Sequence, residues 1–528
     1  MDVVLGRAKV TASKAGAVGL GIVEGERTAR GAAADIDRRS RGAVTALLRS
    51  RDFGGRALET AVLYPRGLGA GRLILVGLGK RAGLDAQRLR LAAAQLARRA
   101  RELRVKTLTF ALPEAEARAD GSRLARLAQA CAEGVVLGHY RHTAYRTEPG
   151  TPPLRKIEIV LGGEGPSSES RRALAAAVAR GSRWAEATCL ARDLASTPGQ
   201  DLTPDGLARR AREIARDTGA RCRVLGVPEI ERLGMGALLA VGRGSAHPPR
   251  FIVLERAPAS SRARGRARKG PGPARVPTVV VIGKGVTFDT GGISLKPAQD
   301  MAKMKYDMSG AAAVLGLFSA LPDLARGPGR ALPFRVVGLI PTAENMPGGN
   351  ALKPGDVVRA MDGTTIEVIT TDAEGRLLLA DALGYAARFK PEAVVDLATL
   401  TGAISIALGH VAAGLFSADE SLAAELLAAG SASDERLWRM PLGEAYASGL
   451  RSDTADIVNS GAREGGASLA ATFLERFARG FPWAHLDIAS TAWSPVERPH
   501  EPRGPTGFGV RLLLEWLSRR ASASARAV

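Results

Sequence analysis

Short apolar runs alternate with amphipathic stretches over the first 165 residues. Leu73–Gly77 and Thr107–Ala111 are mostly apolar and have the length of buried strands. Leu89–Leu103 and Arg123–Leu137 instead repeat apolar side chains at three- and four-residue intervals, as a helix with one buried face does. Strands that alternate with helices are typical of an α/β unit. The pattern therefore predicts an α/β domain here, in which we find no catalytic constellation.

Breaks in this pattern predict the domain boundaries. Thr147–Pro153 is rich in Pro, Gly and Thr, and a short predicted strand, Ile157–Leu161, follows it. After the glycine-rich break at Gly162–Pro166, a long helix is predicted over residues 168–194. A last amphipathic helix is predicted at Val510–Arg519, followed by a frayed tail rich in Ala and Ser. The predicted parts are an N-terminal domain at residues 1–165, a linker helix at 166–195 and a catalytic domain at 196–528.

The segment Thr370–Leu377 carries charges at alternate positions: Asp372, Glu374 and Arg376. In an extended segment alternate side chains point to the same side, so these three side chains are predicted to converge. Two carboxylates at one spot repel each other unless a cation lies between them. A metal site explains the pattern, and the alternative is a solvated turn before a helix.

A second charged segment follows a predicted strand at Thr278–Ile282. Glycines at 283, 285, 291 and 292 allow sharp turns, and four charged residues lie among or just beyond them. Such a stretch beyond a strand end suits a ligand crevice in an α/β sheet, whereas the alternative is a loop with scattered surface charge. The four charged residues are Lys284, Asp289, Lys296 and Asp307.

Taken together, these segments resemble the leucyl aminopeptidase family of dizinc exopeptidases. The family pattern N-T-D-A-E-G-R-L is matched except that Thr370 replaces its Asn, and the G-K-G-x-T-F-D-[ST]-G-G and M-K-x-D-M-x-G-A-A patterns are present. Ser196 and Gln200 also stand where the family carries Asn. The resemblance extends from about Ala191 to about Trp516. Further agreement lies in Glu344–Pro347, Lys353–Asp356, Asp396–Ala403 and Trp483–Ala489.

The resemblance implies a two-domain α/β protein, with an N-terminal domain similar to a macro domain and a C-terminal zinc-exopeptidase domain around a mixed central sheet. It implies an aminopeptidase that releases leucine-like N-terminal residues with a water activated by two metals. The implied metal ligands are Lys284, Asp289, Asp307, Asp372 and Glu374. The implied catalytic residues are Lys296, which stabilises the oxyanion, and Arg376, which holds a bicarbonate ion as general base. The implied substrate-binding residues are Met304, Thr399, Leu400 and Gly402.

The chemistry of these residues agrees with such a site. Oxygen ligands without His or Cys suit Zn²⁺, Mn²⁺ or Mg²⁺, so the sequence leaves zinc and manganese open as cofactors. Lys284 is the unusual ligand, because its ammonium must lose a proton before it can bind a cation. For Met304, ordinary core packing is the alternative to a pocket role. His485 lies in an apolar run and is predicted to be a core residue, not a ligand.

Composition indicates in which compartment the protein is expected. The chain has 528 residues, of which 45% are hydrophobic, as in ordinary globular proteins. Its three cysteines lack metal-type spacing and argue against a disulfide framework, and the N-terminus lacks the apolar core of a signal peptide. Leu397–Phe416 is uncharged and long enough to span a bilayer, but its glycines favour strand, loop and helix. We therefore expect a cytoplasmic protein that does not enter the membrane.

The net charge of +21 leaves a second hypothesis open. Nucleic acid is a possible partner, with Ser261–Gly270 as the sharpest basic cluster, although a solvated surface loop is the simpler interpretation. Aromatic residues are only 4% of the chain, which argues against stacking on single strands. The alternative to a basic binding surface is arginine spread over helix surfaces, as at Arg98, Arg99, Arg101 and Arg104. A phosphoryl-transfer enzyme is disfavoured because no P-loop is present. The family resemblance also implies a homohexamer.

Overall fold

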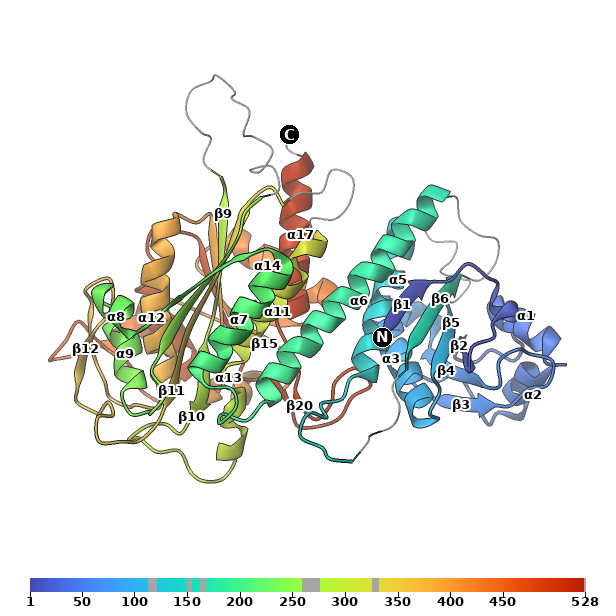
Figure 1. The fold of residues 1–528 in the computed structure, drawn as a ribbon, viewed down its shortest axis with the longest axis horizontal. Coiled ribbons are helices and arrows are strands. Elements are labelled where there is room, and N and C mark those ends of the chain that lie inside the picture. Colours follow the sequence, from blue (N-terminus) through green and yellow to red (C-terminus); the bar gives the residue numbers. More distant parts are fainter. Residues whose placement is uncertain are drawn as a thin grey trace, which may run out of the picture. The chain divides into compact units, whose positions relative to one another are not determined.

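The computed structural model in Figure 1 describes most of the chain. The basic cluster Ser261–Gly270 and the break Gly162–Pro166 lie outside the described residues, so the predictions for them stay open. The described residues are 1–112, 121–148, 150, 154–161, 168–258, 276–324 and 332–526.

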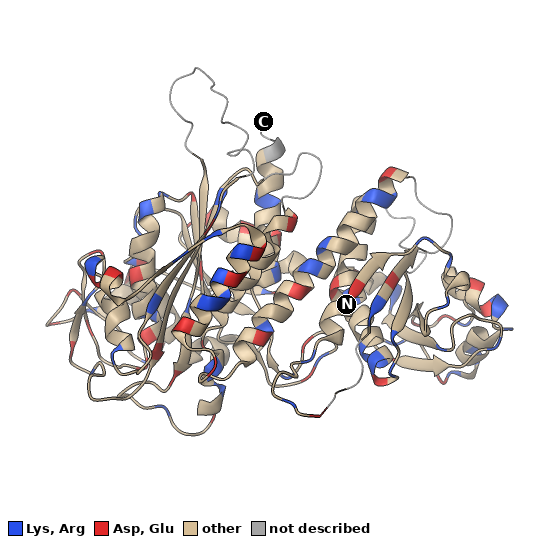
Figure 2. Cartoon of the chain, in the orientation of Figure 1, with Lys and Arg blue, Asp and Glu red and all other residues tan. Residues whose placement is uncertain are grey.

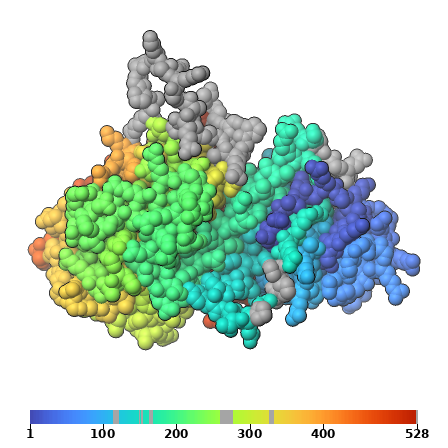
Figure 3. All heavy atoms as spheres, in the orientation of Figure 1, coloured from blue at the N-terminus to red at the C-terminus, as the bar shows by residue number. Residues whose placement is uncertain are grey.

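The chain divides into two compact units. The first comprises Met1–Cys189 and Val496–Arg503, and the second comprises Leu190–Pro495 and Gly504–Val528. Figure 3 draws the atoms of the first unit mainly in blue and cyan, and those of the second in green to red. The division between the units falls within the long helix α6 (Ser168–Ser196), which contains residues 168–195 of the segment predicted as a linker helix.

The first unit is built on a six-stranded sheet with the order β1-β6-β5-β2-β4-β3. Every neighbouring pair is parallel except β3 with β4, so the sheet is mixed. Apolar residues pack on both faces, one core with α3 and α5 and another with α1 and α2. The strands are β1 (Asp2–Leu5), β2 (Ala17–Val23), β3 (Thr60–Leu63), β4 (Leu73–Gly79), β5 (Thr107–Leu112) and β6 (Lys156–Leu161); the helices are α1 (Ala32–Arg39), α2 (Ala43–Ser50), α3 (Ala86–Glu102) and α5 (Gly121–His139).

A close approach between α3 and the sheet depends on glycine in β2. A Cβ atom added at Gly19 would lie 2.3 Å from Leu96 Cδ2, so a side chain there would push the helix away. The elements predicted from periodicity in this unit are confirmed as β4, β5, β6, α3 and α5. One detail is wrong: Arg101 is buried, because its guanidinium donates to the carbonyls of Gly138 and His139 at the end of α5.

The second unit is built on a nine-stranded mixed sheet with the order β16-β15-β18-β14-β9-β11-β8-β7, with β10 paired to β11. Its centre is parallel, and antiparallel pairs join β11 to β8, β8 to β7 and β15 to β18. The predicted two-domain α/β class and mixed central sheet are thus confirmed. The strands are β7 (Arg221–Leu225), β8 (Arg250–Arg256), β9 (Thr278–Gly283), β10 (Gly285–Asp289), β11 (Arg335–Asn345), β14 (Ala393–Ala398), β15 (Ala413–Phe416), β16 (Leu437–Arg439) and β18 (Trp483–Asp487).

Helices cover both faces of this sheet. Val280 and Ile282 of β9 belong to a core that includes side chains of α9, α12 and α16. Val279 and Val281 alternate with them and therefore point to the opposite face, where α11 contacts β9 and also α7 and α17. The helices are α7 (Pro204–Thr218), α9 (Gly236–Gly242), α11 (Ser309–Leu324), α12 (Glu374–Ala386), α16 (Gly466–Glu475) and α17 (Val510–Arg526).

The uncharged stretch Leu397–Phe416 has the mixed structure that its glycines indicate. It contains the end of β14, the short helix α13 (Gly402–Leu408) and β15. Across the part of the chain that the structure describes, none of the helices combines the length and the apolarity needed to cross a bilayer. The last helix, α17, continues to Arg526, so the prediction of fraying after Arg519 is wrong for residues 520–526.

A buried polar network ties β14 to β18. The Asp396 carboxylate accepts hydrogen bonds from Trp483 Nε1 at 2.7 Å and from His485 Nδ1 at 2.6 Å. His485 is fully buried, as predicted for a core residue. Burial alone would lower the pKa of His485, but the Asp396 carboxylate outweighs it and raises that pKa. Asp396 of β14 therefore fixes the orientations of the Trp483 and His485 rings on the neighbouring strand β18.

Replacing Asp396 with Ala should lower the melting temperature of the protein by several degrees. The substitution leaves the Trp483 and His485 donors unpaired in the interior, at a cost of about 1–3 kcal/mol for each. Differential scanning calorimetry measures the effect. Asp396→Asn is the control and should lose less, because its amide oxygen still accepts one hydrogen bond. An Asp396→Ala variant that melts with the wild type would show that the network contributes no stability.

Candidate metal centre

The charged residues singled out in the sequence gather where the central parallel strands end. Lys284 lies between β9 and β10, and Asp289 is the last residue of β10. Asp307 follows a short 3₁₀ helix, Met301–Tyr306, and Asp372 lies in the turn before α12. Glu374 is the first residue of α12. The carboxyl ends of parallel strands are the usual place for a ligand site in an α/β sheet.

Three of the carboxylates converge, but not for the reason that the sequence indicated. Ligand oxygens of Asp289, Asp372 and Glu374 lie within 4.8 Å of one another. The segment is not extended, because Thr371 and Asp372 form a turn and the helix begins at Glu374. The prediction that side chains would alternate along a strand is therefore wrong, and the turn itself brings the two acids together.

Two lysines compensate these carboxylates. Lys284 Nζ lies 2.8 Å from Asp307 Oδ2 and 2.8 Å from Glu374 Oε1. Lys296 Nζ lies 2.8 Å from Asp289 Oδ2 and also contacts Asp372. Burial alone would lower the pKa of both lysines, yet the surrounding carboxylates raise both pKa values above the usual range. Burial raises the pKa values of Asp307, Asp372 and Glu374.

The donor set fits divalent metal ions. Four carboxylates with two ammonium groups leave two negative charges uncompensated in a largely buried site, where unpaired charge is costly. Two divalent ions, with Lys284 neutral, would more than compensate these negative charges. The candidate donor atoms are one nitrogen and several carboxylate oxygens, a set suited to zinc or manganese. The convergence of Asp289, Asp372 and Glu374 supports a metal-binding cluster.

Asn345 and Thr371 hold this cluster together, and sequence reasoning gave neither a role. Asn345 Nδ2 donates to Asp289 Oδ1 at 2.8 Å and to the Thr371 carbonyl at 3.0 Å. Thr371 Oγ1 donates to the Gly291 carbonyl at 2.6 Å. The only sequence signal was the place of Asn345 at the end of a long apolar run, within a motif shared with the resembling family.

Two glycines are required by this geometry. Gly291 has a φ of +86°, and a Cβ atom there would lie 2.4 Å from the Ser294 carbonyl oxygen. A Cβ atom at Gly375 would lie 2.7 Å from Lys284 Cε. A side chain at position 375 would therefore displace the buried lysine, which explains why a glycine follows Glu374.

The residues predicted to bind substrate have different surroundings. Thr399 Oγ1 donates to Asp307 Oδ1 at 2.7 Å, and the Thr399 carbonyl accepts from Lys284 Nζ at 2.9 Å. Leu400 packs against the core under α12, and Met304 is half-buried in the 3₁₀ helix. A Cβ atom at Gly402 would meet nothing within 4 Å, so the backbone there borders open space. The substrate-binding role of these residues stays a prediction.

Arg376 points to a different neighbour from Asp372 and Glu374. Its Nη1 donates to the Asn459 carbonyl at 2.7 Å, whereas its buried Nε has no hydrogen-bond partner among the described residues. Burial lowers the pKa of Arg376 to about 10. Asn459 is fully buried and also binds the 369–370 backbone: its Oδ1 accepts from Ile369 N at 2.8 Å, and its Nδ2 donates to the Thr370 carbonyl at 2.7 Å.

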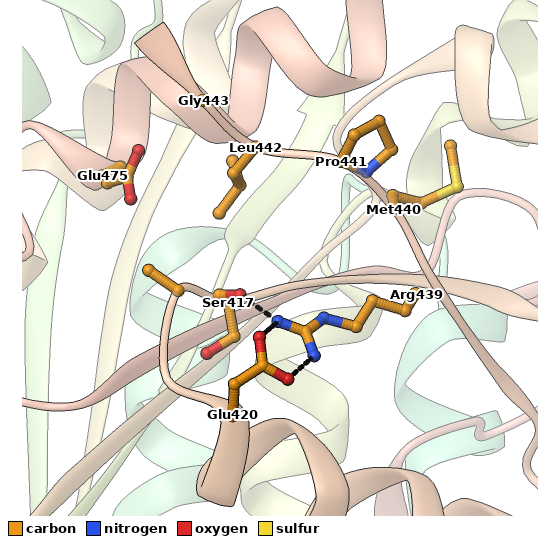
Figure 4. A pocket seen from close by; sticks show the side chains of 9 residues that line it. Ser417, Glu420, Arg439, Met440, Pro441, Leu442, Gly443 and Glu475 are labelled. Carbon is orange, nitrogen blue, oxygen red and sulfur yellow. Dashed lines mark hydrogen bonds and ion pairs between the residues drawn. The ribbon is translucent and has the colours of Figure 1, made fainter.

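A separate pocket of about 570 Å³ lies beyond the ends of β15 and β16 (Figure 4). The Arg439 guanidinium is held there by both carboxylate oxygens of Glu420 and by the Ser417 carbonyl. None of the converging carboxylates lines it.

The surface charge is mixed, since basic and acidic side chains are both spread over the helices in Figure 2. Arg98 and Arg99 both pair with Glu102 on α3, as expected for helix-surface arginines.

Comparison with known proteins identifies the family. Residues 18–149 match the N-terminal domain of the cytosol aminopeptidase family, and residues 189–514 match its catalytic domain. A probable cytosol aminopeptidase of Roseiflexus castenholzii is 45% identical over 475 residues, covering 89% of this chain and 92% of that protein. One of Geobacter sp. is 46% identical over 484 residues, covering 91% and 92%.

Solved structures agree with this assignment. The bottromycin maturation enzyme BotP in complex with Mn is 41% identical, with a TM-score of 0.81, and the match covers 96% of this chain and all of that one. A mutant of tomato leucine aminopeptidase is 33% identical, with a TM-score of 0.84, and the match covers 98% and 96%. Both domains and the acidic cluster thus agree: the chain belongs to the cytosol aminopeptidase family and is a metal-dependent aminopeptidase.

Proposed function

We propose that this aminopeptidase releases leucine-like apolar residues from peptides with a free N-terminus, and that it uses two divalent metal ions. The observation that carries this proposal is the set of four carboxylates and one buried lysine at the ends of the central strands. Lys284, Asp289, Asp307, Asp372 and Glu374 are the proposed ligands. Zinc and manganese both suit this set, and the manganese-bound structure of BotP supports the second.

When bound, the metals would supply Lewis-acid activation of water and of the scissile carbonyl, and would bind the free amine of the substrate. Lys284 must be neutral in that state, because an ammonium has no free electron pair. Its side chain is only 3% exposed, and the Thr399 carbonyl holds its Nζ in place. The chain therefore presents Lys284 to a cation from a fixed position.

Lys296 is proposed to stabilise the oxyanion that develops on the substrate carbonyl. Its side chain is 21% exposed, against 3% for Lys284, so its ammonium can reach a molecule that approaches from solvent. The carboxylates of Asp289 and Asp372 aim it at the cluster. A charged donor at such a position is worth about 3–4 kcal/mol of transition-state stabilisation.

Arg376 is proposed to hold bicarbonate, which would accept the proton of the attacking water. The unpartnered, buried Nε of Arg376 supports an anion there, since an unused buried donor is costly. The motifs around the cluster contain no histidine that could act as the base. The guanidinium is fixed by Asn459 and would orient the anion.

Met304, Thr399, Leu400 and Gly402 are proposed to border the side-chain pocket of the substrate. The open space at Gly402 supports this placement.

We also propose that the protein forms a homohexamer and is cytoplasmic; the names of the relatives support the location. The small number of cysteines, three, agrees with a reducing compartment. A nucleic-acid role stays a prediction, because its sharpest cluster lies outside the described residues.

Chelation should abolish hydrolysis of leucine p-nitroanilide by the purified protein, and Mn²⁺ or Zn²⁺ should restore it. The metals are expected to be essential because the carboxylates alone provide no electrophile. The matched substrate is N-acetyl-leucine p-nitroanilide, which lacks the free amine and should not be cleaved. Full activity after metal removal, or equal cleavage of the acetylated substrate, would refute a metal-dependent exopeptidase.

Asp289→Ala should lower kcat by at least a thousandfold and reduce the bound metal. Asp289 would hold metal in the proposed centre, and Lys296 Nζ and Asn345 Nδ2 also contact its carboxylate. Elemental analysis with steady-state kinetics measures both effects. Wild-type turnover with wild-type metal content in this variant would show that Asp289 is not a metal ligand.

Lys296→Ala should lower kcat by about 10²–10³-fold while leaving metal content nearly unchanged, as expected for an oxyanion donor that is not a ligand. Metal analysis and kinetics on the same sample separate the two roles. If the variant lost its metal together with its activity, Lys296 would have to be assigned as a ligand instead.

A further inference from the structure

Asp487 does not belong to the proposed ligands but binds residues adjacent in sequence to Thr399, which contacts two of them. The function proposed above gives it no role. It is the last residue of β18 and is fully buried. In the parallel pair of β14 and β18, Asp487 lies opposite Ala398. Its carboxylate therefore lies beside the chain that leaves β14, the short irregular connection Thr399–Thr401 that leads to α13 and is called the turn below.

The Asp487 carboxylate binds this turn at several points. Oδ1 accepts from Leu400 N at 3.1 Å, and Oδ2 accepts from Thr401 Oγ1 at 2.6 Å. Oδ1 also accepts from Ala489 N at 3.2 Å, which lies two residues after Asp487 and outside this turn. The Thr401 N–H points to the same Oδ1, at 3.5 Å. An acceptor with two oxygens is needed, because all of these partners donate.

The same turn holds the proposed ligands on its other side. The Thr399 carbonyl accepts from Lys284 Nζ, and the Thr399 hydroxyl donates to Asp307 Oδ1. The backbone of Lys284 is tied to the same strand, since its N–H donates to the Leu397 carbonyl at 3.0 Å. A displacement of the turn would therefore move both the amine and the carboxylate that Thr399 orients.

We propose that Asp487 is a positioning residue, which fixes the turn Thr399–Thr401 so that Thr399 holds Lys284 and Asp307 in ligand geometry. This inference rests on the proposed two-metal function. Groups that orient metal ligands typically contribute 10–100-fold to metal affinity or activity. Asp487 would act indirectly, because its carboxylate accepts from Leu400 and Thr401, which follow Thr399 in the chain, and from Ala489.

The test is Mn²⁺ binding by Asp487→Asn, measured by calorimetric titration of the full-length, metal-free protein. The amide of Asn has the same shape as the carboxylate, but one of its oxygens is replaced by an NH₂ group. It therefore cannot accept hydrogen bonds from all of Leu400 N, Thr401 Oγ1 and Ala489 N. We expect the dissociation constant of one Mn²⁺ to rise 10–100-fold. We also expect kcat at low Mn²⁺ to fall similarly and to recover at high Mn²⁺, because a higher Mn²⁺ concentration refills the weakened site.

Asp381→Asn is the matched control. Asp381 is also a fully buried carboxylate that accepts backbone N–H groups, from Leu238 and Met361 at 2.8 Å each, and neither donor belongs to the proposed metal site. It should lower the melting temperature but keep wild-type Mn²⁺ affinity. Equal Mn²⁺ affinity in Asp487→Asn and wild type, or an equal loss in the control, would overturn the positioning role.

A second pair of variants decides the matter if Asp487→Asn does not fold. Thr401→Val removes the hydroxyl that binds Asp487, whereas Thr401→Ser keeps it. Mn²⁺ binding should weaken several-fold in Thr401→Val and stay unchanged in Thr401→Ser, and equal binding in both would overturn the inference. A wild-type protein that binds no Mn²⁺ or Zn²⁺ would refute the proposed function itself. Metal binding by the wild type with no change in the variants refutes only the role of Asp487.

Discussion

The catalytic unit depends on the compensation of four carboxylates gathered at the ends of its central strands. Asp289, Asp307 and Glu374 are almost completely buried, and such charges are stable only when they are paired. Lys284 and Lys296 supply the pairing within the chain, and they contact all four carboxylates between them. The mixed sheet, the glycines beside it and the turn before α12 all serve to bring these charges to one place.

This arrangement makes the metal centre part of the fold. Three of the proposed ligands are held by neighbours from other segments: Asn345 holds Asp289, and Thr399 holds Asp307 together with Lys284. The strand ends are rigid because β9, β11 and β14 are parallel neighbours with apolar residues on both faces. Precise placement of ligands by the sheet reduces the rearrangement that metal binding would otherwise require.

Neither the first unit nor the surface arginines take part in the metal centre. The six-stranded sheet has cores on both faces and matches the N-terminal domain of the family, but its described residues show no cluster comparable to the metal centre. Much of the arginine lies on helix surfaces, where pairs such as Arg99 with Glu102 are exposed and contribute little to stability. Arg101 is one of several buried exceptions, since it binds two carbonyls at the end of α5.

The sequence by itself determined the class of fold, most secondary elements and the motif residues of the site. It could do so because helix and strand periodicity is local, and because the motifs keep a characteristic order and spacing. Only the tertiary structure decided how the side chains meet. Periodicity suggested an extended segment at Asp372–Arg376, whereas a turn and a helix start bring the acids together and direct Arg376 to Asn459. The hydrogen bonds of Thr399 with Asp307 and of Asp487 with Leu400 join residues more than 80 positions apart. Such partners depend on strand order and register, which no local pattern encodes.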